Sequence, residues 1–133
     1  MTADKEILRT FFDDINRNDI AAAARAFAPD IVRHEPEGFP TSGVHRGADD
    51  VKAHLAQGRG TWAEGSCDPE DYLLAGDKIV VLLHARVRMH DREDWIDGRF
   101  ADGFILKGGK ITEWRTFFER SEALAWSGLP SLS

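Results

Sequence analysis

The apolar residues of the N-terminal half recur every three or four positions, a spacing that gathers side chains on one face of an α-helix. This spacing predicts a helix over residues 3–16, and Asp19 can cap a second, alanine-rich helix over 20–28. Ser121 can cap a last short helix over 122–127, which Gly128 closes. A further helix is predicted to have Asp49 and Asp50 in its first turn, where acids interact favourably with the helix dipole, and to end at Gly58.

From about residue 62 onward, apolar and polar residues alternate, as they do in a β-strand whose side chains point to opposite faces in turn. This alternation predicts strands over 69–75, 78–90 and the two halves of a hairpin at 95–118. A short earlier strand is predicted over 31–35. The Gly- and Pro-rich segment 37–47 is predicted to be an irregular loop.

The face that the hairpin turns inward depends on the length of its loop. A two-residue loop at 108–109 would place Asp102 opposite Arg115 as a cross-strand ion pair. A three-residue loop at 107–109 with a bulge would place Asp102 opposite Trp114. The second register is favoured because it gathers the most apolar side chains on one face, namely Phe100, Phe104, Leu106, Trp114 and Phe118. It predicts a lone carboxylate in an aromatic wall, with a pKa raised by desolvation.

Composition indicates a single domain, residues 1–133, of the ordinary globular kind, with 42% hydrophobic and 30% charged residues. The net charge is −6 and the basic residues are scattered, which argues against nucleic acid as a partner. The one cysteine, Cys67, falls in a loop-like stretch and fits a reducing compartment. Neither a signal-peptide pattern nor an apolar span of about 18 residues is found. We therefore expect a cytoplasmic protein with no membrane partner.

Helices followed by a meander of long strands predict an α+β fold, with the helices on one face of a curved antiparallel sheet. Such a sheet, closed by helices, leaves a conical apolar cavity in which a small ligand binds.

Three segments carry a family resemblance; they read LRTFFDDINRNDIAAAARAFAPDIVRHEP, GVHRGADDVKAHL and RFADGFILKGGKITEWRTFFERSEALAWSGL. In order and spacing they resemble the SnoaL-like branch of the NTF2-like (ketosteroid isomerase-like) superfamily. The resemblance implies an NTF2-like cone, in which the curved sheet wraps around three N-terminal helices. It also implies a homodimer packed through the sheet faces and no cofactor. The family's functions include polyketide cyclases, isomerases, dehydratases, epoxide hydrolases and non-catalytic binders.

The resemblance assigns roles residue by residue. In the steroid isomerase branch a general-base carboxylate ends the first strand, and Glu35 stands at the similar place. The protonated acid of the late sheet, which hydrogen-bonds an oxyanion, is similar in position to Asp102. The tyrosine of that branch corresponds to Phe11, and a carboxylate that limonene epoxide hydrolases need corresponds to Thr116. The resemblance therefore implies acid–base chemistry by Asp102 rather than true steroid isomerisation or epoxide hydrolysis.

Four residues are candidates for proton transfer. Asp102 is the main candidate acid or base; its alternative is a surface carboxylate paired with an arginine. Glu35 and His34 compete for a second role, because only one of two adjacent strand residues faces inward. His54 is either a proton carrier in the pocket or a core residue. The other residues expected to contact a ligand are Phe11, Leu55, Met89, Phe100, Phe104, Trp114, Thr116 and Phe118.

A polar stripe on the outer face of the sheet is predicted to form a dimer interface; it consists of His84, Arg86, Arg88, His90, Glu113 and Arg115. No metal is expected, because the five histidines lack the close spacing of a zinc site.

The sequence thus predicts a small-molecule pocket protein. The favoured hypothesis is an enzyme that uses general acid–base proton transfer on an apolar oxygenated substrate, as an isomerase, cyclase or dehydratase does. The alternative is a non-catalytic ligand-binding or dimerisation module with the same fold.

Overall fold

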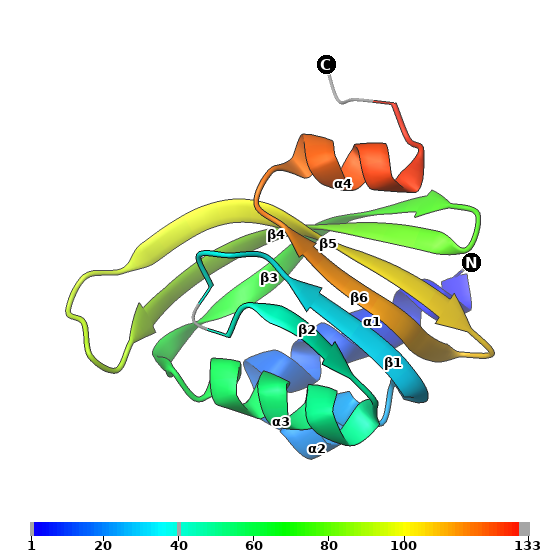
Figure 1. Cartoon of the computed structure of the whole chain (residues 1–133). Helices are drawn as coiled ribbons and strands as arrows, with labels where there is room; N and C mark the ends of the chain where they lie inside the picture. The colour runs from blue at the N-terminus through cyan, green and yellow to red at the C-terminus, as the bar shows by residue number, and fades with distance from the viewer. Residues whose placement is uncertain (1, 40, 131–133) are drawn as a thin grey trace.

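Six strands form one curved sheet with helices on both of its faces (Figure 1). The computed structural model describes residues 2–39 and 41–130. In chain order, the elements are α1 (Thr2–Asn16), α2 (Ile20–Ala24), β1 (Phe27–Glu35), β2 (Gly43–Arg46), α3 (Ala48–Arg59), β3 (Trp62–Ala75), β4 (Lys78–Met89), β5 (Ile96–Lys107), β6 (Lys110–Phe117) and α4 (Arg120–Ser127).

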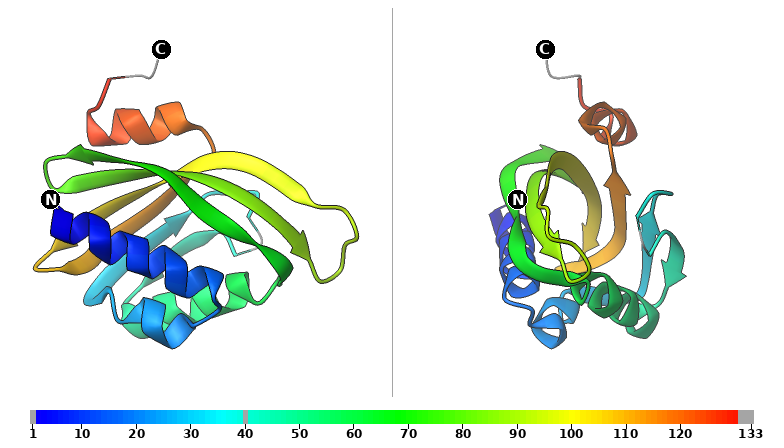
Figure 2. Two further views of the ribbon diagram at one scale, coloured as in Figure 1. Left: turned by 180° about the vertical axis from the view of Figure 1, so that it is seen from behind. Right: turned by 90° about the vertical axis from the view of Figure 1, so that its left-hand side faces the viewer.

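The strands lie in the order β2-β1-β6-β5-β4-β3. Neighbours are antiparallel except β1 and β6, which are parallel, so the sheet is mixed rather than wholly antiparallel. Helices α1, α2 and α3 close the concave face, and α4 packs on the opposite face (Figure 2). This arrangement confirms the predicted α+β cone.

Strand β1 begins at Phe27, where the sequence pattern predicts that the second helix continues. Phe27 pairs with Ile111 of β6, whose backbone N–H donates to the Ala26 carbonyl at 2.7 Å. Burial of Phe27 in the core therefore outweighs the helix propensity of the alanine-rich run. The pairing shifts between Phe27 and Val32, and this irregularity accommodates Pro29 inside the strand.

Other boundaries also differ from the sequence prediction, among them the start of α4, which begins at Arg120 instead of residue 122. The segment 37–47 contains β2, which pairs with β1. Strand β3 starts at Trp62 instead of residue 69 because its whole length pairs with β4. Helix α3 continues through Gly58 to Arg59 and is capped by Gly60. In the two strands, pairing to a neighbour supplies backbone hydrogen bonds that the local composition does not reveal.

The hairpin between β5 and β6 has a two-residue loop at 108–109, so the predicted three-residue loop is wrong. Both glycines have positive φ, 58° and 78°, as a type I′ turn requires. The extra residue is instead a bulge at Thr112, which lies between the pairs Leu106–Ile111 and Ile105–Glu113.

The bulge determines which side chains face the core. Asp102 lies opposite Thr116, so neither predicted partner, Arg115 or Trp114, is the observed one. A two-residue loop plus one bulged residue nevertheless leaves Asp102 on the same face as Trp114 and Thr116. The bulge also turns Ile111 into the core beside Trp114, although simple alternation assigns them to opposite faces. The predicted inward face is correct, while the predicted register is wrong.

Buried apolar residues form a cluster on each face of the sheet. The larger cluster lies between the sheet and α1–α3 and includes Leu8, Phe11, Ile31, Val51 and Phe104. The smaller one joins α4 to β4 and β5 through Val80, Leu82, Ala101 and Ala123. In the described part of the chain, every helix is too short or too polar to cross a bilayer.

Candidate functional site

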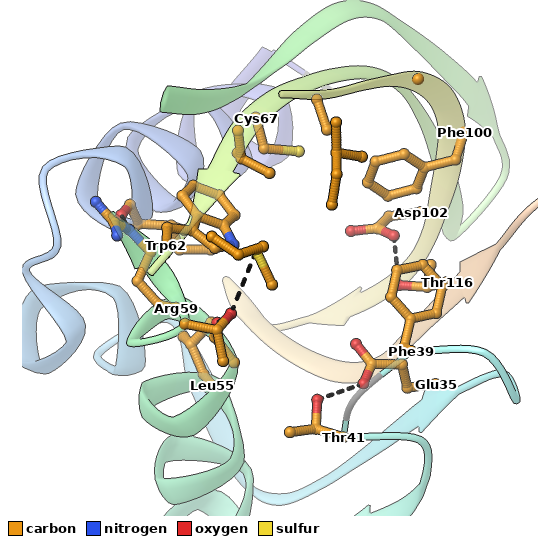
Figure 3. Close-up of a pocket in the computed structure, with 18 of the residues that line it drawn as sticks. Glu35, Phe39, Thr41, Leu55, Arg59, Trp62, Cys67, Phe100, Asp102 and Thr116 are labelled. Atoms are coloured by element: carbon orange, nitrogen blue, oxygen red, sulfur yellow. Dashed lines mark hydrogen bonds between the residues drawn. The ribbon is translucent and has the colours of Figure 1, made fainter. Parts of the chain in front are cut away.

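A cavity of about 760 Å³ lies between the concave face of the sheet and helices α1 and α3 (Figure 3). Its walls are mainly apolar, with Trp62, Phe100 and Trp114 among the lining residues. Phe39 stacks on Phe118 with 4.6 Å between ring centroids, and Phe118 is 46% exposed, so this pair lies where the cavity meets solvent. A cavity of this size and character suits a small organic ligand.

Asp102 projects from β5 into this cavity, although only 3% of the residue is exposed. Thr116 Oγ1 donates to its Oδ1 at 2.6 Å, and Trp114 Nε1 donates to its Oδ2 at 2.9 Å. Burial raises the pKa of Asp102 above its usual value, while the charge of Arg33 and the two hydrogen bonds act in the opposite direction. The net effect favours the protonated acid.

Arg33 is a buried cation of the site that sequence reasoning missed; it is 3% exposed. Its Nη2 donates to Glu35 Oε2 at 3.0 Å and to Thr116 Oγ1 at 2.8 Å. Its guanidinium group lies 3.9 Å from the centroid of the Trp114 ring. Thr116 therefore accepts from Arg33 and donates to Asp102, which links the three polar groups.

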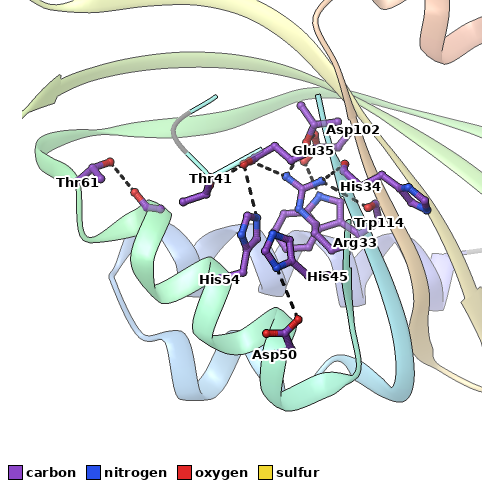
Figure 4. A network of polar contacts seen from close by, with 12 residues as sticks. Arg33, His34, Glu35, Thr41, His45, Asp50, His54, Thr61, Asp102 and Trp114 are labelled. Atoms are coloured by element: carbon purple, nitrogen blue, oxygen red, sulfur yellow. Dashed lines mark hydrogen bonds and ion pairs between the residues drawn. The ribbon is translucent and has the colours of Figure 1, made fainter. Parts of the chain in front are cut away.

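Glu35 is the second carboxylate of the cavity and follows Arg33 on the same face of β1, with 11% of its side chain exposed. Thr41 Oγ1 donates to Glu35 Oε1 at 2.6 Å, and His54 Nε2 lies 3.6 Å from the same oxygen (Figure 4). Strand alternation was the available signal for Arg33, because it shares the inward face with Ile31 and Glu35.

His54 lies on α3 behind Glu35, and its ring stacks on that of His45 with 3.9 Å between centroids and 27° between planes. His45 belongs to β2, and its Nδ1 lies 3.6 Å from Asp50 Oδ2. Burial lowers the pKa of His54 to about 4; Glu35 opposes this effect, and His45 and Arg33 add to it.

Most residues that the sequence predicts for the site line the cavity, namely Glu35, His54, Leu55, Met89, Phe100, Asp102, Trp114, Thr116 and Phe118. The other three lie elsewhere. His34 points to the outer face because it alternates with inward-facing neighbours on β1. Phe11 and Phe104 lie behind the cavity wall, where Phe11 packs edge-on against Trp114 at 5.2 Å and against Phe104 at 6.0 Å.

Cys67 lies in β3, where it is buried and lines the cavity, and not in a loop as the sequence suggests. Burial raises the pKa of its thiol, so this cysteine is held in the unreactive protonated form. Over residues 2–39 and 41–130, no three His, Cys, Asp or Glu side chains are grouped so that they could hold a metal ion.

Comparison with known proteins agrees with this fold. Residues 8–114 match the SnoaL-like domain family. An uncharacterised protein of Mycobacterium tuberculosis is 31% identical over 118 residues, which are 87% of this chain and 88% of that protein.

Two solved structures share the fold. An NTF2-like protein of unknown function from Burkholderia pseudomallei has a TM-score of 0.80 at 23% identity, over 94% of this chain and 97% of that one. TerC, co-crystallised with polyporic acid, has a TM-score of 0.77 at 19% identity, over 95% of this chain and 98% of that one. With a family match over most of its length and a cone that encloses a small-molecule pocket, the chain belongs to the SnoaL-like domain family within the NTF2-like fold.

Proposed function

We propose that this protein is an enzyme that catalyses general acid–base proton transfer on an apolar, oxygenated small molecule. Isomerisation, cyclisation and dehydration of such compounds all begin with removal of a proton next to a carbonyl group. The observation that carries the proposal is Asp102, a carboxyl group with a raised pKa that is buried in the wall of an apolar cavity.

Asp102 acts in this proposal as the acid. The positive charge of Arg33 is already matched by Glu35, so an ionised Asp102 would leave an excess negative charge in a desolvated wall. The protonated carboxyl group instead donates a hydrogen bond to the substrate oxygen as negative charge develops there. Trp114 and Thr116 hold it in place throughout.

Glu35 acts as the base. It accepts the proton from the substrate carbon, while Asp102 donates to the oxygen of the resulting enol or enolate. Return of the proton to a different carbon completes an isomerisation. In a cyclisation, the enolate attacks a second carbonyl carbon, and Glu35 returns its proton to the alkoxide oxygen that forms. The mainly apolar lining of the cavity weakens dielectric screening, which strengthens both interactions.

One observation favours the alternative of a non-catalytic binding module. All four carboxylate oxygens of Asp102 and Glu35 already interact with protein groups. A purely structural network would be satisfied in the same way.

A solvent-exchange experiment separates the two functions. In D₂O, an enzyme of the proposed kind exchanges the hydrogens next to the carbonyl of a bound ketone, even when no net product forms. We expect the substitutions Asp102→Asn and Glu35→Gln each to lower the exchange rate by about 10²–10⁴-fold. The matched control is Asp97→Asn, which neutralises an exposed carboxylate on β5 outside the cavity.

Mass spectrometry or ¹H NMR of the ketone measures the exchange. Full activity of the Asp102→Asn protein would reject Asp102 as the acid. A ligand that binds without any exchange, in the wild type and in all three variants, would support the binding module instead.

Polyporic acid is a useful first ligand, because a protein of the same fold was co-crystallised with it. Trp62 and Trp114 line the cavity, so quenching of tryptophan fluorescence reports binding directly. As a further part of this proposal, two copies of the chain associate through the outer face of the sheet, where the predicted polar stripe lies.

A further inference from the structure

The stacked rings of His54 and His45 join the cavity to the protein surface between β1, β2 and α3 (Figure 4). Each ring directs one nitrogen at a carboxylate. His54 Nε2 faces Glu35 Oε1 at 3.6 Å, and His45 Nδ1 faces Asp50 Oδ2 at 3.6 Å. The side chain of His54 is 4% exposed and that of Asp50 is 61% exposed.

The second nitrogen of each ring indicates which protonation state of the histidine the site favours. His54 Nδ1 and His45 Nε2 are buried, and neither has a hydrogen-bond partner among the described residues. In a neutral ring that donates to its carboxylate, this second nitrogen carries only a lone pair. In an imidazolium it would be an N–H donor with no acceptor, which is the costlier state in a buried site.

The neighbouring charges act on His54 in both directions: Glu35 and Asp50 favour the cation, whereas Arg33 and His45 oppose it. Burial, the largest effect, favours the neutral ring. Arg33 and Glu35 face it from β1, His45 from β2, and Asp50 from its own helix. Arg33 already supplies one full positive charge to Glu35. A second cation on His54 would make Glu35 a weaker base, because opposite charge favours the ionised carboxylate over the protonated one.

We propose that His54 is a positioning residue for Glu35: as a neutral imidazole it directs its Nε2–H at Oε1, and the stacked His45 keeps it neutral. This role rests on the function proposed above, in which Glu35 is the base. The neutral donor orients the carboxylate and stabilises its ionised form less than an imidazolium would. The distance of 3.6 Å is long for a hydrogen bond, and we expect it to shorten when a ligand closes the site.

NMR titration of the histidine rings tests the proposal without any substrate. In the wild type we expect His54 to remain neutral from about pH 8 down to pH 5, in contrast to an ordinary histidine. The His45→Ala protein loses the ring that covers His54, so water enters and the His54 midpoint rises by about one pH unit. The matched His45→Phe protein keeps an apolar ring there, and its His54 midpoint stays low.

A wild-type His54 that titrates near pH 6.5 would overturn the proposal, as would equal midpoints in the Ala and Phe variants. Because these spectra require no turnover, they remain interpretable if the exchange assay finds no active ketone. Conversely, a Glu35 that is dispensable for exchange would remove the proposed function and leave the His54 protonation state unchanged.

A second pair of variants tests the positioning role in the exchange assay. His54→Gln places an amide N–H close to the position of Nε2, and we expect its kcat to stay within about threefold of the wild type. His54→Phe keeps the ring and loses the donor, and we expect kcat to fall by about 10–100-fold with little change in KM. Equal kcat values for the two variants would show that His54 only fills space.

Discussion

At the scale of single residues, burial and the polar neighbours of Asp102 act on its pKa in opposite directions. Its neighbours Thr116 and Trp114 stabilise the carboxylate, whereas removal from water destabilises it and raises the pKa. The charge of Arg33 is the largest effect that stabilises the carboxylate, and the negative charge of Glu35 acts against it. The result is an acid that keeps its proton at a higher pH than a solvated aspartic acid does.

The raised pKa predicts a specific dependence of stability on pH. Between about pH 4 and the raised pKa, the folded protein binds more protons at Asp102 than the unfolded chain does. The free energy of unfolding therefore falls as pH rises through this window, by at most about 1.4 kcal/mol per pH unit from this group. Asp102→Asn removes this contribution.

Denaturant unfolding of both proteins across this pH range measures the effect. Subtraction of the two stability curves isolates Asp102 from the other titrating groups. Curves that run parallel would mean that the Asp102 carboxyl group ionises in the folded protein as readily as in the unfolded one.

The sequence identified some of these residues better than others. Alternation along the late hairpin was enough to place Asp102 among aromatic residues, because the face on which a strand residue lies follows from its neighbours in the sequence. The partners Arg33 and His45 were missed, although alternation on β1 places Arg33 on the inward face with Glu35. Their side chains matter only because β1 lies beside β6, and β2 beside α3, and no short-range pattern encodes that proximity.

At the scale of elements, the packing of the C-terminal helix α4 on the outer face of the sheet depends on one glycine, Gly103. Gly103 follows Asp102 on β5 and points outward, where the ring of Trp126 lies against it. A Cβ atom at position 103 would lie 2.5 Å from Trp126 Cζ3, closer than atoms can approach. The docking of α4 therefore depends on the absence of a side chain directly behind the proposed acid.

This contact predicts that Gly103→Ala destabilises the protein by about 1–3 kcal/mol, because Trp126 and α4 must shift away from the sheet. Gly98→Ala is the matched control on the same strand, since a Cβ atom there would meet no other atom within 4 Å. We expect it to be close to neutral. Thermal unfolding of the two variants makes the comparison, and equal melting temperatures would contradict this account of the helix contact.

In the β5–β6 hairpin, too, packing decides a detail that the sequence pattern leaves open. Its two glycines correctly marked a turn, but the sequence pattern placed the extra residue in the loop and the structure places it at Thr112. Both arrangements satisfy alternation on β5. The position of the bulge is decided by the core, which takes both Ile111 and Trp114.

At the scale of the whole molecule, the outer face of the sheet has two different halves. Helix α4 covers the apolar half over Val80 and Leu82. The other half carries the polar stripe, in which His84 and Arg86 contact Asp97. Such paired charges at the surface contribute little to the stability of one chain. They are suited to a polar interface between two copies.

The proposed dimer makes a measurable prediction. In sedimentation experiments at about 10–100 μM, we expect the wild type to be a dimer. Arg86→Glu places an acid beside Asp97 and should weaken dimerisation by at least about tenfold. Lys52→Glu makes the same charge change on α3, outside the sheet face, and should leave the dimer intact. A wild type that sediments as a monomer would reject the dimer.

The sequence by itself determined the kinds of all elements except β2, the α+β class, the family and the inward face of the late hairpin. The elements, the class and the inward face follow from hydrophobic periodicity, and the family follows from the resemblance of three segments to a known family. Only the tertiary structure decided the register, the parallel pairing of β1 with β6, the packing of α4, and the meeting of Arg33, Glu35 and Asp102 at one cavity. The physical reason is that these features depend on packing between residues far apart in the chain, where burial overrides local preference.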